Sequence, residues 1–443
     1  MLHAISPVDG RYADKTRQLQ PYFSEFALIQ YRVRVEIVYF QALASIDILD
    51  IPDSVLQSLT DIWTMFTEAD ALKIKEIERK TNHDVKAVEY FLRNALTDRG
   101  LGEHIEFIHF GLTSQDINNT AIPLSLKEAA TSVLLPEIQA IITDLKILAT
   151  TWKDVPMLAR THGQPASPTL LGKEMMVFVE RLEKQKVLFE AIPYAAKFGG
   201  ATGNFNAHHV AYPNINWPQF SDTFCKSLGL ERSQFTTQIE HYDMLAAHFQ
   251  SLSRINTIFI DMCRDIWAYI SMDYFRQLVV KDEVGSSAMP HKVNPIDFEN
   301  AEGNLGIANA LCGFLAEKLP ISRLQRDLTD STVLRNIGMP YAHSLIALQS
   351  IRKGLSKLIL NDDQIARDLE VNWSVLAEPI QTILRRERYP DPYNALKTLT
   401  RGQSKLTRET LNYFIDNLDI TNTVKEELRQ LKPEIYTGVH PQY

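Results

Sequence analysis

From His241 to Val284 the chain contains neither glycine nor proline. Apolar side chains recur there at steps of mostly three or four residues, at Leu245, Phe249, Leu252, Ile255, Ile258, Phe259, Met262, Ile266 and Ile270. This spacing predicts one continuous amphipathic helix, with Thr236 or Thr237 capping its approach and Gly285 ending it. At ~1.5 Å per residue such a rod would span very roughly 60 Å. It could not hide its apolar stripe inside one compact monomer.

Apolar stripes also follow helical spacing over 173–192 and 136–153. Only 18 glycines occur among 443 residues, and Leu/Ile/Glu/Lys-rich stretches favour helix over strand nearly throughout. We therefore predict an all-α fold with a central long-helix bundle that other subunits complete. Length and composition shifts suggest three helical domains, at 1–110, 111–355 and 356–443, with a distinctive loop at 282–298.

Composition excludes several classes of protein. A net charge of −8 disfavours non-specific nucleic-acid binding, because a polyanion would be repelled. The three cysteines show no spacing typical of disulfide frameworks or zinc sites, and no signal peptide or membrane span is evident, so we expect a cytoplasmic protein. Phosphate-binding, dinucleotide-binding, zinc-protease and hydrolase motifs are missing, which predicts no cofactor and no metal.

The segment 281–300, KDEVGSSAMPHKVNPIDFEN, is rich in hydrogen-bond donors and poor in core residues. Gly285, Ser286 and Ser287 offer consecutive N–H groups that could hold an anion, while Lys292 and Asn294 add a charge and an amide. A surface lid without chemistry explains the same composition equally well.

Two further segments carry a histidine outside any apolar stripe. RTHGQPA places His162 between a helix end and a Gly/Pro-bounded turn, where imidazole could donate a proton, although a lone histidine is more often structural. In TNHD, Thr81 or Asn82 could be only an N-cap and Asp84 only a partner of the helix dipole.

Hydroxyl and guanidinium groups gather in two more places. Thr113 and Ser114 precede a probable helix and suit either capping or carboxylate binding. Arg323, Arg326 and Arg335 crowd together beside Ser331, which suits a bound phosphate or carboxylate, although Asp327 and Asp330 could neutralise them as surface ion pairs.

The run GSSAMPHKVNP at 285–295 resembles the signature loop of the fumarase/aspartase superfamily. Around it SPVDGRY, KTNHDVKAVEYFL, TSQDINN, RTHGQPA, TTQIE and QRDLTDSTVLRN are similar to the adenylosuccinate lyase family of the bacterial type, in the family's order from residue 6 to about 380. Gln115 and Ala288 depart from the family's common Glu and Thr, but neither replaces a proton carrier.

The resemblance implies a β-elimination that releases fumarate, from adenylosuccinate to give AMP and from the carboxamide ribonucleotide SAICAR to give AICAR, in purine biosynthesis. It implies Ser286 as general base and His162 as general acid, in a homotetramer whose active sites are shared between subunits. The implied nucleotide-binding residues are Arg11, Tyr12, Asn82, His83, Asp84, Arg326, Ser331 and Arg335, and those around the succinyl carboxylates are Thr113, Ser114, Gln238, Lys292 and Asn294.

Two other interpretations stay open on the sequence alone. Another lyase of the superfamily could act on argininosuccinate, malate or aspartate, in which case the arginine-rich segment would be structural. A helical scaffold without turnover would require the proton carriers to be replaced, and here both Ser286 and His162 are present.

Overall fold

The computed structural model describes residues 2–278, 292–401 and 406–443, with backbone alone for 398–401. Two compact units emerge, which we treat separately. Unit 1 comprises Met1–Gln139, Lys184–Ile260 and Ala301–Gln349, and unit 2 comprises Ala140–Glu183, Asp261–Asn300 and Ser350–Tyr443. The three-domain division expected from the sequence stays a prediction.

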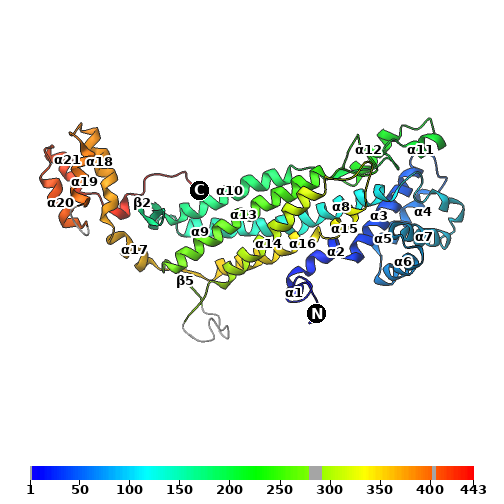
Figure 1. Cartoon of the computed structure of the whole chain (residues 1–443), viewed down its shortest axis with the longest axis horizontal. Helices are drawn as coiled ribbons and strands as arrows, with labels where there is room; N and C mark the ends of the chain where they lie inside the picture. The colour runs from blue at the N-terminus through cyan, green and yellow to red at the C-terminus, as the bar shows by residue number, and fades with distance from the viewer. Residues whose placement is uncertain (1, 279–291, 402–405) are drawn as a thin grey trace. The chain divides into compact units, whose positions relative to one another are not determined.

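Helices dominate the described residues, which confirms the predicted all-α class (Figure 1). The α-helices are α1 (Ala13–Thr16), α2 (Gln20–Phe23), α3 (Glu25–Ala44), α4 (Asp53–Ser58), α5 (Asp61–Thr64), α6 (Glu68–Thr81), α7 (Asp84–Thr97), α8 (Ser114–Ala129), α9 (Leu135–Thr151), α10 (Leu171–Glu190), α11 (Asn206–Ala211), α12 (Trp217–Ser227), α13 (Asp243–Ser271), α14 (Ile296–Lys318), α15 (Thr329–Leu334), α16 (Gly338–Ser356), α17 (Asp362–Glu370), α18 (Ala377–Arg386), α19 (Pro392–Arg401), α20 (Arg408–Asp416) and α21 (Asn422–Arg429).

The described strands form three two-stranded sheets. β1 (Pro156–Thr161) pairs with β2 (Gln164–Leu170) and β5 (Phe275–Gln277) with β6 (Leu358–Leu360), both antiparallel, whereas β3 (Ala195–Ala196) and β4 (Glu231–Arg232) are parallel. The β1–β2 hairpin is the longest of these pairs, and strand at this position was not expected.

Helix α13 is shorter than predicted, because it ends at Ser271 rather than near Val284. Asp273 adopts a left-handed conformation with φ 61°, and the Tyr274 N–H reaches back to the Tyr269 carbonyl at 2.9 Å. This is a Schellman-type end, a role that usually falls to glycine but that Asp tolerates. The chain then enters β5, and residues 279–284 lie outside the described residues.

Helices α9 and α10 begin and end within two residues of the predicted ranges. A π-helical turn over Ala130–Leu134 joins α8 to α9 immediately before Pro136. Proline lacks an N–H and its ring clashes with the carbonyl four residues earlier, so a widened turn at this point accommodates it.

Unit 1 has its core around α3, which is buried along most of its length and packs chiefly on α8. Ser24 caps α3 by accepting the Ala27 N–H at 3.1 Å. Within the same unit, α13 and α16 are joined by a hydrogen bond from Asn256 to Ser344 at 3.0 Å. The packing of α3 on α8 fixes two of the helices that carry the candidate site described below.

Unit 2 contains the β1–β2 hairpin and a small apolar cluster of the C-terminal helices around Leu376, Ile380, Leu384 and Ile415. Its part of α14 packs closely on α16, since a Cβ at Gly354 would lie 2.7 Å from the Phe298 ring. The hairpin is held against α17 by an ion pair between Arg160 and Asp368 at 2.7 Å. None of the helices in the described ranges combines the length and the apolar character that a membrane span requires.

Candidate active site

The junction between α6 and α7 carries one group of candidate residues in unit 1. Asn82 takes a left-handed conformation with φ 50° and ends α6. His83 is the N-cap of α7, and its Nδ1 accepts the Lys86 N–H at 3.1 Å. The N-cap role considered for Thr81 or Asn82 is therefore wrong, because the imidazole nitrogen satisfies the unpaired helix donor. His83 Nε2 lies 3.4 Å from Ser114 Oγ, which brings two candidate segments together.

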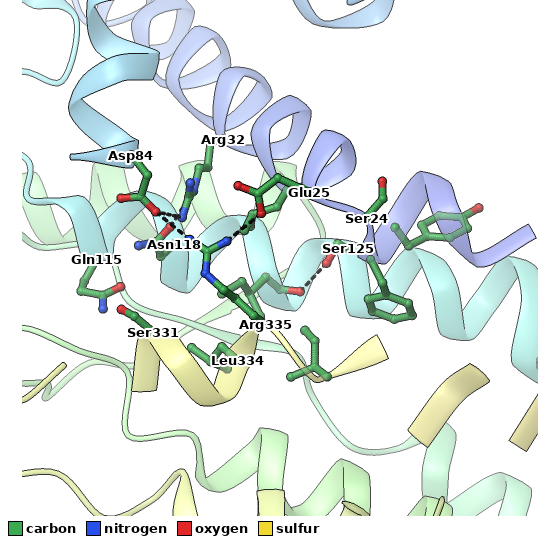
Figure 2. Close-up of a pocket in the computed structure, with 15 residues that line it drawn as sticks. Ser24, Glu25, Arg32, Asp84, Gln115, Asn118, Ser125, Ser331, Leu334 and Arg335 are labelled. Atoms are coloured by element: carbon green, nitrogen blue, oxygen red, sulfur yellow. Dashed lines mark hydrogen bonds and ion pairs between the residues drawn. The ribbon is translucent and has the colours of Figure 1, made fainter. Parts of the chain in front are cut away.

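Asp84, the first residue of α7, lies between two arginines (Figure 2). Its Oδ2 contacts Arg32 at 2.7 Å and Arg335 at 3.2 Å, and its Oδ1 accepts the Val85 N–H. Burial acts to raise the pKa of Asp84, but the adjacent Arg32 guanidinium and the other donors outweigh it and lower the pKa below its ordinary value. Arg335 also pairs with Glu25 at 2.7 Å. Two guanidinium groups and two carboxylates, Arg32, Arg335, Asp84 and Glu25, thus form one charge-balanced cluster.

These groups surround a cavity of about 130 Å³ in unit 1, shown in Figure 2. Its lining combines apolar side chains with charged, amide and hydroxyl groups, as ligand sites commonly do. Candidates from the TNHD segment and from the arginine-rich segment meet at this cavity, because Asp84, Ser331 and Arg335 all line it. The remaining lining residues are Tyr22, Phe23, Ser24, Glu25, Leu28, Arg32, Gln115, Asn118, Ile122, Ser125, Leu334 and Ile337.

The arginine-rich segment divides into three different environments. Arg323 forms an exposed ion pair with Asp327 at 3.0 Å, as the alternative of surface neutralisation predicted. Arg326 instead donates to Ser331 Oγ at 2.9 Å and lies 3.6 Å from Asp330, with its side chain 20% exposed. Arg335 belongs to the cavity wall. The segment therefore contains an ion pair at the surface, made by Arg323, and a more enclosed arginine, Arg326, that contacts Ser331 and Asp330.

Thr113 is the N-cap of α8, and its loop is anchored by a buried ion pair. Asp116 Oδ2 accepts the Thr113 N–H at 2.8 Å, while Oδ1 contacts Lys197 Nζ at 2.8 Å. Oδ1 also accepts the N–H groups of 199–200 at 2.8 and 3.1 Å. Both charged side chains are 0% exposed, and burial lowers the pKa of Lys197 although Asp116 offsets part of this. This ion pair fixes the backbone that presents Thr113 and Ser114.

Several predicted residues do not line the cavity. Arg11 is exposed, and Tyr12 and Gln238 are half-buried. The candidate residues of unit 1 outside the lining are Arg11, Tyr12, Asn82, His83, Thr113, Ser114, Gln238 and Arg326. Their expected contacts with substrate stay predictions.

His162 lies in unit 2 at the tip of the β1–β2 hairpin, rather than after a helix end as the sequence suggested. His162 and Gly163 have φ values of 54° and 74° between the paired residues Thr161 and Gln164. Two consecutive left-handed residues are typical of a type I′ hairpin turn. The imidazole is exposed, and within the described residues it makes no hydrogen bond or ion pair. It is therefore accessible to a ligand or to another subunit.

Ser286, the expected general base, lies outside the described residues, as does the loop from 279 to 291. The two other candidate residues of this loop are described in unit 2, where Lys292 is exposed and Asn294 is half-buried. The Val293 carbonyl accepts from Gln277 at 3.3 Å, which connects this end of the loop to β5.

Sequence reasoning missed Arg32 and Glu25, and it considered Asp330 only as a surface ion-pair partner of the nearby arginines, whereas Asp330 is buried. Arg32 is 4% exposed, and Nε donates to Asn118 at 2.9 Å while Nη2 contacts Asp84. A charged residue inside the apolar run FALIQYRVRVEIVYF was an available signal, because a buried charge requires a partner. Glu25 resembles an ordinary surface acid in the sequence, so nothing marked it, and nothing in the sequence indicated that Asp330 would be buried.

Solved structures with the same fold include other enzymes at low sequence identity. The 3-carboxy-cis,cis-muconate lactonizing enzyme from Pseudomonas putida matches with a TM-score of 0.75 and 20% identity, covering 95% of this chain and 94% of that chain. A fumarate lyase from Mesorhizobium sp. BNC1 matches with a TM-score of 0.74 and 19% identity, covering 96% and 95%. Residues 10–309 match the protein family described as Lyase. Fold and sequence together define a helical lyase.

The narrower family follows from the C-terminal part and from full-length relatives. Residues 322–437 match the family described as adenylosuccinate lyase C-terminal. The adenylosuccinate lyase of Dictyostelium discoideum is 57% identical over 100% of this chain and 98% of its own length, and that of Escherichia coli K12 is 49% identical over 99% and 97%. The chain belongs to the adenylosuccinate lyase family, as the sequence motifs predicted.

Proposed function

We propose that the chain splits adenylosuccinate into fumarate and AMP, and SAICAR into fumarate and AICAR, in purine biosynthesis. The observation that carries this proposal is the cavity at which Asp84, Ser331 and Arg335 meet, because these residues come from distant segments that both match the family. Two relatives named adenylosuccinate lyase that align along nearly the whole chain support it further.

The reaction is a β-elimination. A base takes a proton from the succinyl carbon beside a carboxylate, the C–N bond breaks, and its electron pair leaves on the nitrogen, which must be protonated. We assign the first proton transfer to Ser286 and the second to His162. A hydroxyl is a poor base unless its anion is stabilised, and Lys292, Asn294 and loop N–H groups have the charge and donors for this. A positioned imidazole typically contributes ~10²–10⁴-fold to such a step.

We assign the succinyl carboxylates to Thr113, Ser114 and Gln238 together with the loop residues. The rigid setting of Thr113 supports this, since the buried Asp116–Lys197 pair holds its backbone in place. Preorganised donors lower the cost of stabilising charge that develops in the transition state.

The nucleotide portion is assigned to Arg11, Tyr12, Asn82, His83, Asp84, Arg326, Ser331 and Arg335. Arg335 is the clearest anion ligand among them, because its guanidinium faces the cavity between Glu25 and Asp84. An anionic group of the substrate would replace one of these carboxylates as its partner.

A homotetramer with active sites shared between subunits is part of the proposal. Support comes from His162, an exposed imidazole on a hairpin tip that is accessible to a site completed by another subunit. A reducing cytoplasmic setting agrees with the three cysteines, which are buried and free.

A fumarate-release assay tests the function directly. The purified chain should release fumarate from adenylosuccinate and from SAICAR, and far less from argininosuccinate, malate or aspartate. Release from argininosuccinate, malate or aspartate alone would indicate a different lyase of the superfamily, and release from none of the substrates would indicate a scaffold without turnover.

A mixing experiment tests the sharing of sites. His162→Ala and Ser286→Ala should each be nearly inactive alone, and reassembled mixtures should recover part of the activity, because some sites then receive both intact residues. If mixtures stay as inactive as the parents while exchange of subunits is verified, the two residues do not come from different chains.

A further inference from the structure

Asp330 is a buried carboxylate for which the proposed chemistry has no use. It lies in α15 with its side chain 5% exposed. Its Oδ1 accepts the Ser331 N–H at 2.7 Å, and its Oδ2 accepts from Gln115 Nε2 at 3.0 Å and from the Tyr242 hydroxyl at 2.8 Å. Arg326 lies 3.6 Å away and supplies the opposite charge. Both oxygens are therefore occupied by donors.

The partners of Asp330 come from three separate parts of the chain, each beside candidate substrate residues. Gln115 follows Ser114, Tyr242 comes shortly after Gln238, and Ser331 is itself a candidate. Gln115 and Ser331 both line the cavity, where they lie close together in Figure 2, whereas Asp330 is not part of the lining. Asp330 thus lies behind the wall of the cavity.

The connection continues deeper into unit 1. The Tyr242 hydroxyl accepts from Asn119 Nδ2 at 2.9 Å, and Asn119 Oδ1 accepts the Glu240 N–H at 2.9 Å. Burial and the nearby Asp330 charge raise the pKa of Tyr242 well above its ordinary value, so its hydroxyl stays protonated and can donate. The segment that carries Gln238 is consequently tied to the same carboxylate.

We propose that Asp330 is a positioning residue that sets the arrangement of Ser331, Arg326 and Gln115 for binding of the substrate's nucleotide portion. The proposal rests on the proposed function of this site. Asp330 acts through its partners and does not touch the substrate. Since the partners converge on one carboxylate, a change at Asp330 should weaken ligand binding more than it affects the chemical step.

Asp330→Asn is the sharpest substitution, because it keeps size and shape. Both oxygens of Asp330 face donors, so the amide NH₂ of asparagine would oppose a donor whichever way it is oriented. A lost interaction of this kind in a buried site should change binding by roughly tenfold or more. Loss of uniform binding raises KM and leaves kcat nearly unchanged.

The experiment compares wild type, Asp330→Asn and Tyr242→Phe, with Ser344→Ala as the control. Ser344 is fully buried in unit 1 and hydrogen-bonded to Asn256, away from the cavity lining. For each variant we would measure kcat and KM for adenylosuccinate, the Kd for AMP, and Tm. Asp330→Asn should raise both KM and the AMP Kd roughly tenfold with kcat within about threefold, whereas the control should lower Tm alone.

Tyr242→Phe removes one donor and keeps the charge of Asp330, so KM and the AMP Kd should rise about threefold. If Asp330→Asn does not fold, the KM and AMP Kd of Tyr242→Phe test the positioning role of Asp330 instead. Unchanged KM and AMP Kd in the folded variants, or a fall in kcat and Tm without a change in binding, would overturn the role of Asp330. Absence of fumarate release by the wild type would instead refute the proposed function, and the AMP Kd would still report on Asp330.

Discussion

The buried pair of Asp116 and Lys197 should be among the most costly polar interactions to break in unit 1. Both side chains are 0% exposed and their charged atoms are 2.8 Å apart. Asp116→Asn would leave the ammonium without a counter-charge, and the amide NH₂ would oppose either the Thr113 N–H or the N–H groups of 199–200. Removing one partner of a buried ion pair costs roughly 3–5 kcal/mol. For a unit of this size that corresponds to a fall in Tm on the order of 5–10 °C.

Lys197→Met should cost less, because Asp116 would keep its backbone N–H donors while losing only the cation. The double variant should be less destabilised than the sum of the two single variants, since neither buried charge would then lack its partner. Thermal unfolding followed by circular dichroism measures all three differences.

The control is Glu106→Gln, which removes the pairing of Glu106 with Arg93 in the same unit, where the glutamate side chain is 75% exposed. Such a pair contributes at most about 1 kcal/mol. If Asp116→Asn lowers Tm no more than Glu106→Gln, or if the single-variant losses simply add in the double variant, the reasoning about the buried pair is wrong.

Three further expectations follow from the structure. His162→Ala should lower kcat about 10²–10⁴-fold with Tm unchanged, as steady-state kinetics and thermal unfolding would reveal, because an exposed hairpin tip contributes little to packing. Arg335→Met should raise KM roughly tenfold or more through loss of a charge-assisted contact, and an unchanged KM would contradict its binding role. Burial lowers the pKa of His248 to about 3, so its contribution to stability is present above about pH 6.5 and is lost as pH falls, by roughly 3 kcal/mol at pH 4. Between about pH 6.5 and pH 4 the free energy of unfolding, measured with denaturant, should therefore fall less in His248→Phe than in the wild type.

The helical class was predictable because apolar spacing is a local property of the sequence, and α9 and α10 lie where their stripes indicated. The end of α13 was not predictable from the same pattern. Asp273 ends the helix in a conformation that usually marks glycine, and the apolar periodicity carries no warning of it. The β1–β2 hairpin escaped detection because a short two-stranded pair depends on contacts with α17 and its neighbours more than on its own composition.

Matching motifs residue by residue selected Asp84, Ser331 and Arg335, which the fold brings to one cavity, while their contacts with substrate stay predictions. Motifs could not indicate which groups hold these side chains in place. Arg32 and Asp330 act through pairing across distant segments, and such pairing exists only once α3, α7, α8 and α15 have packed together. Sequence patterns identify the residues that differ from their surroundings, whereas supporting partners are defined by the fold.

The two-residue turn at His162 limits how a proton could be delivered. A long loop could move its side chains over a wide range of positions. Here the backbone reverses direction within two residues between paired strands, so the imidazole can move by little more than rotation of its own side chain. The reach of this group is consequently set by the length of the hairpin. Inserting a single residue at the tip should therefore misplace the imidazole, our proposed acid, as effectively as removing it.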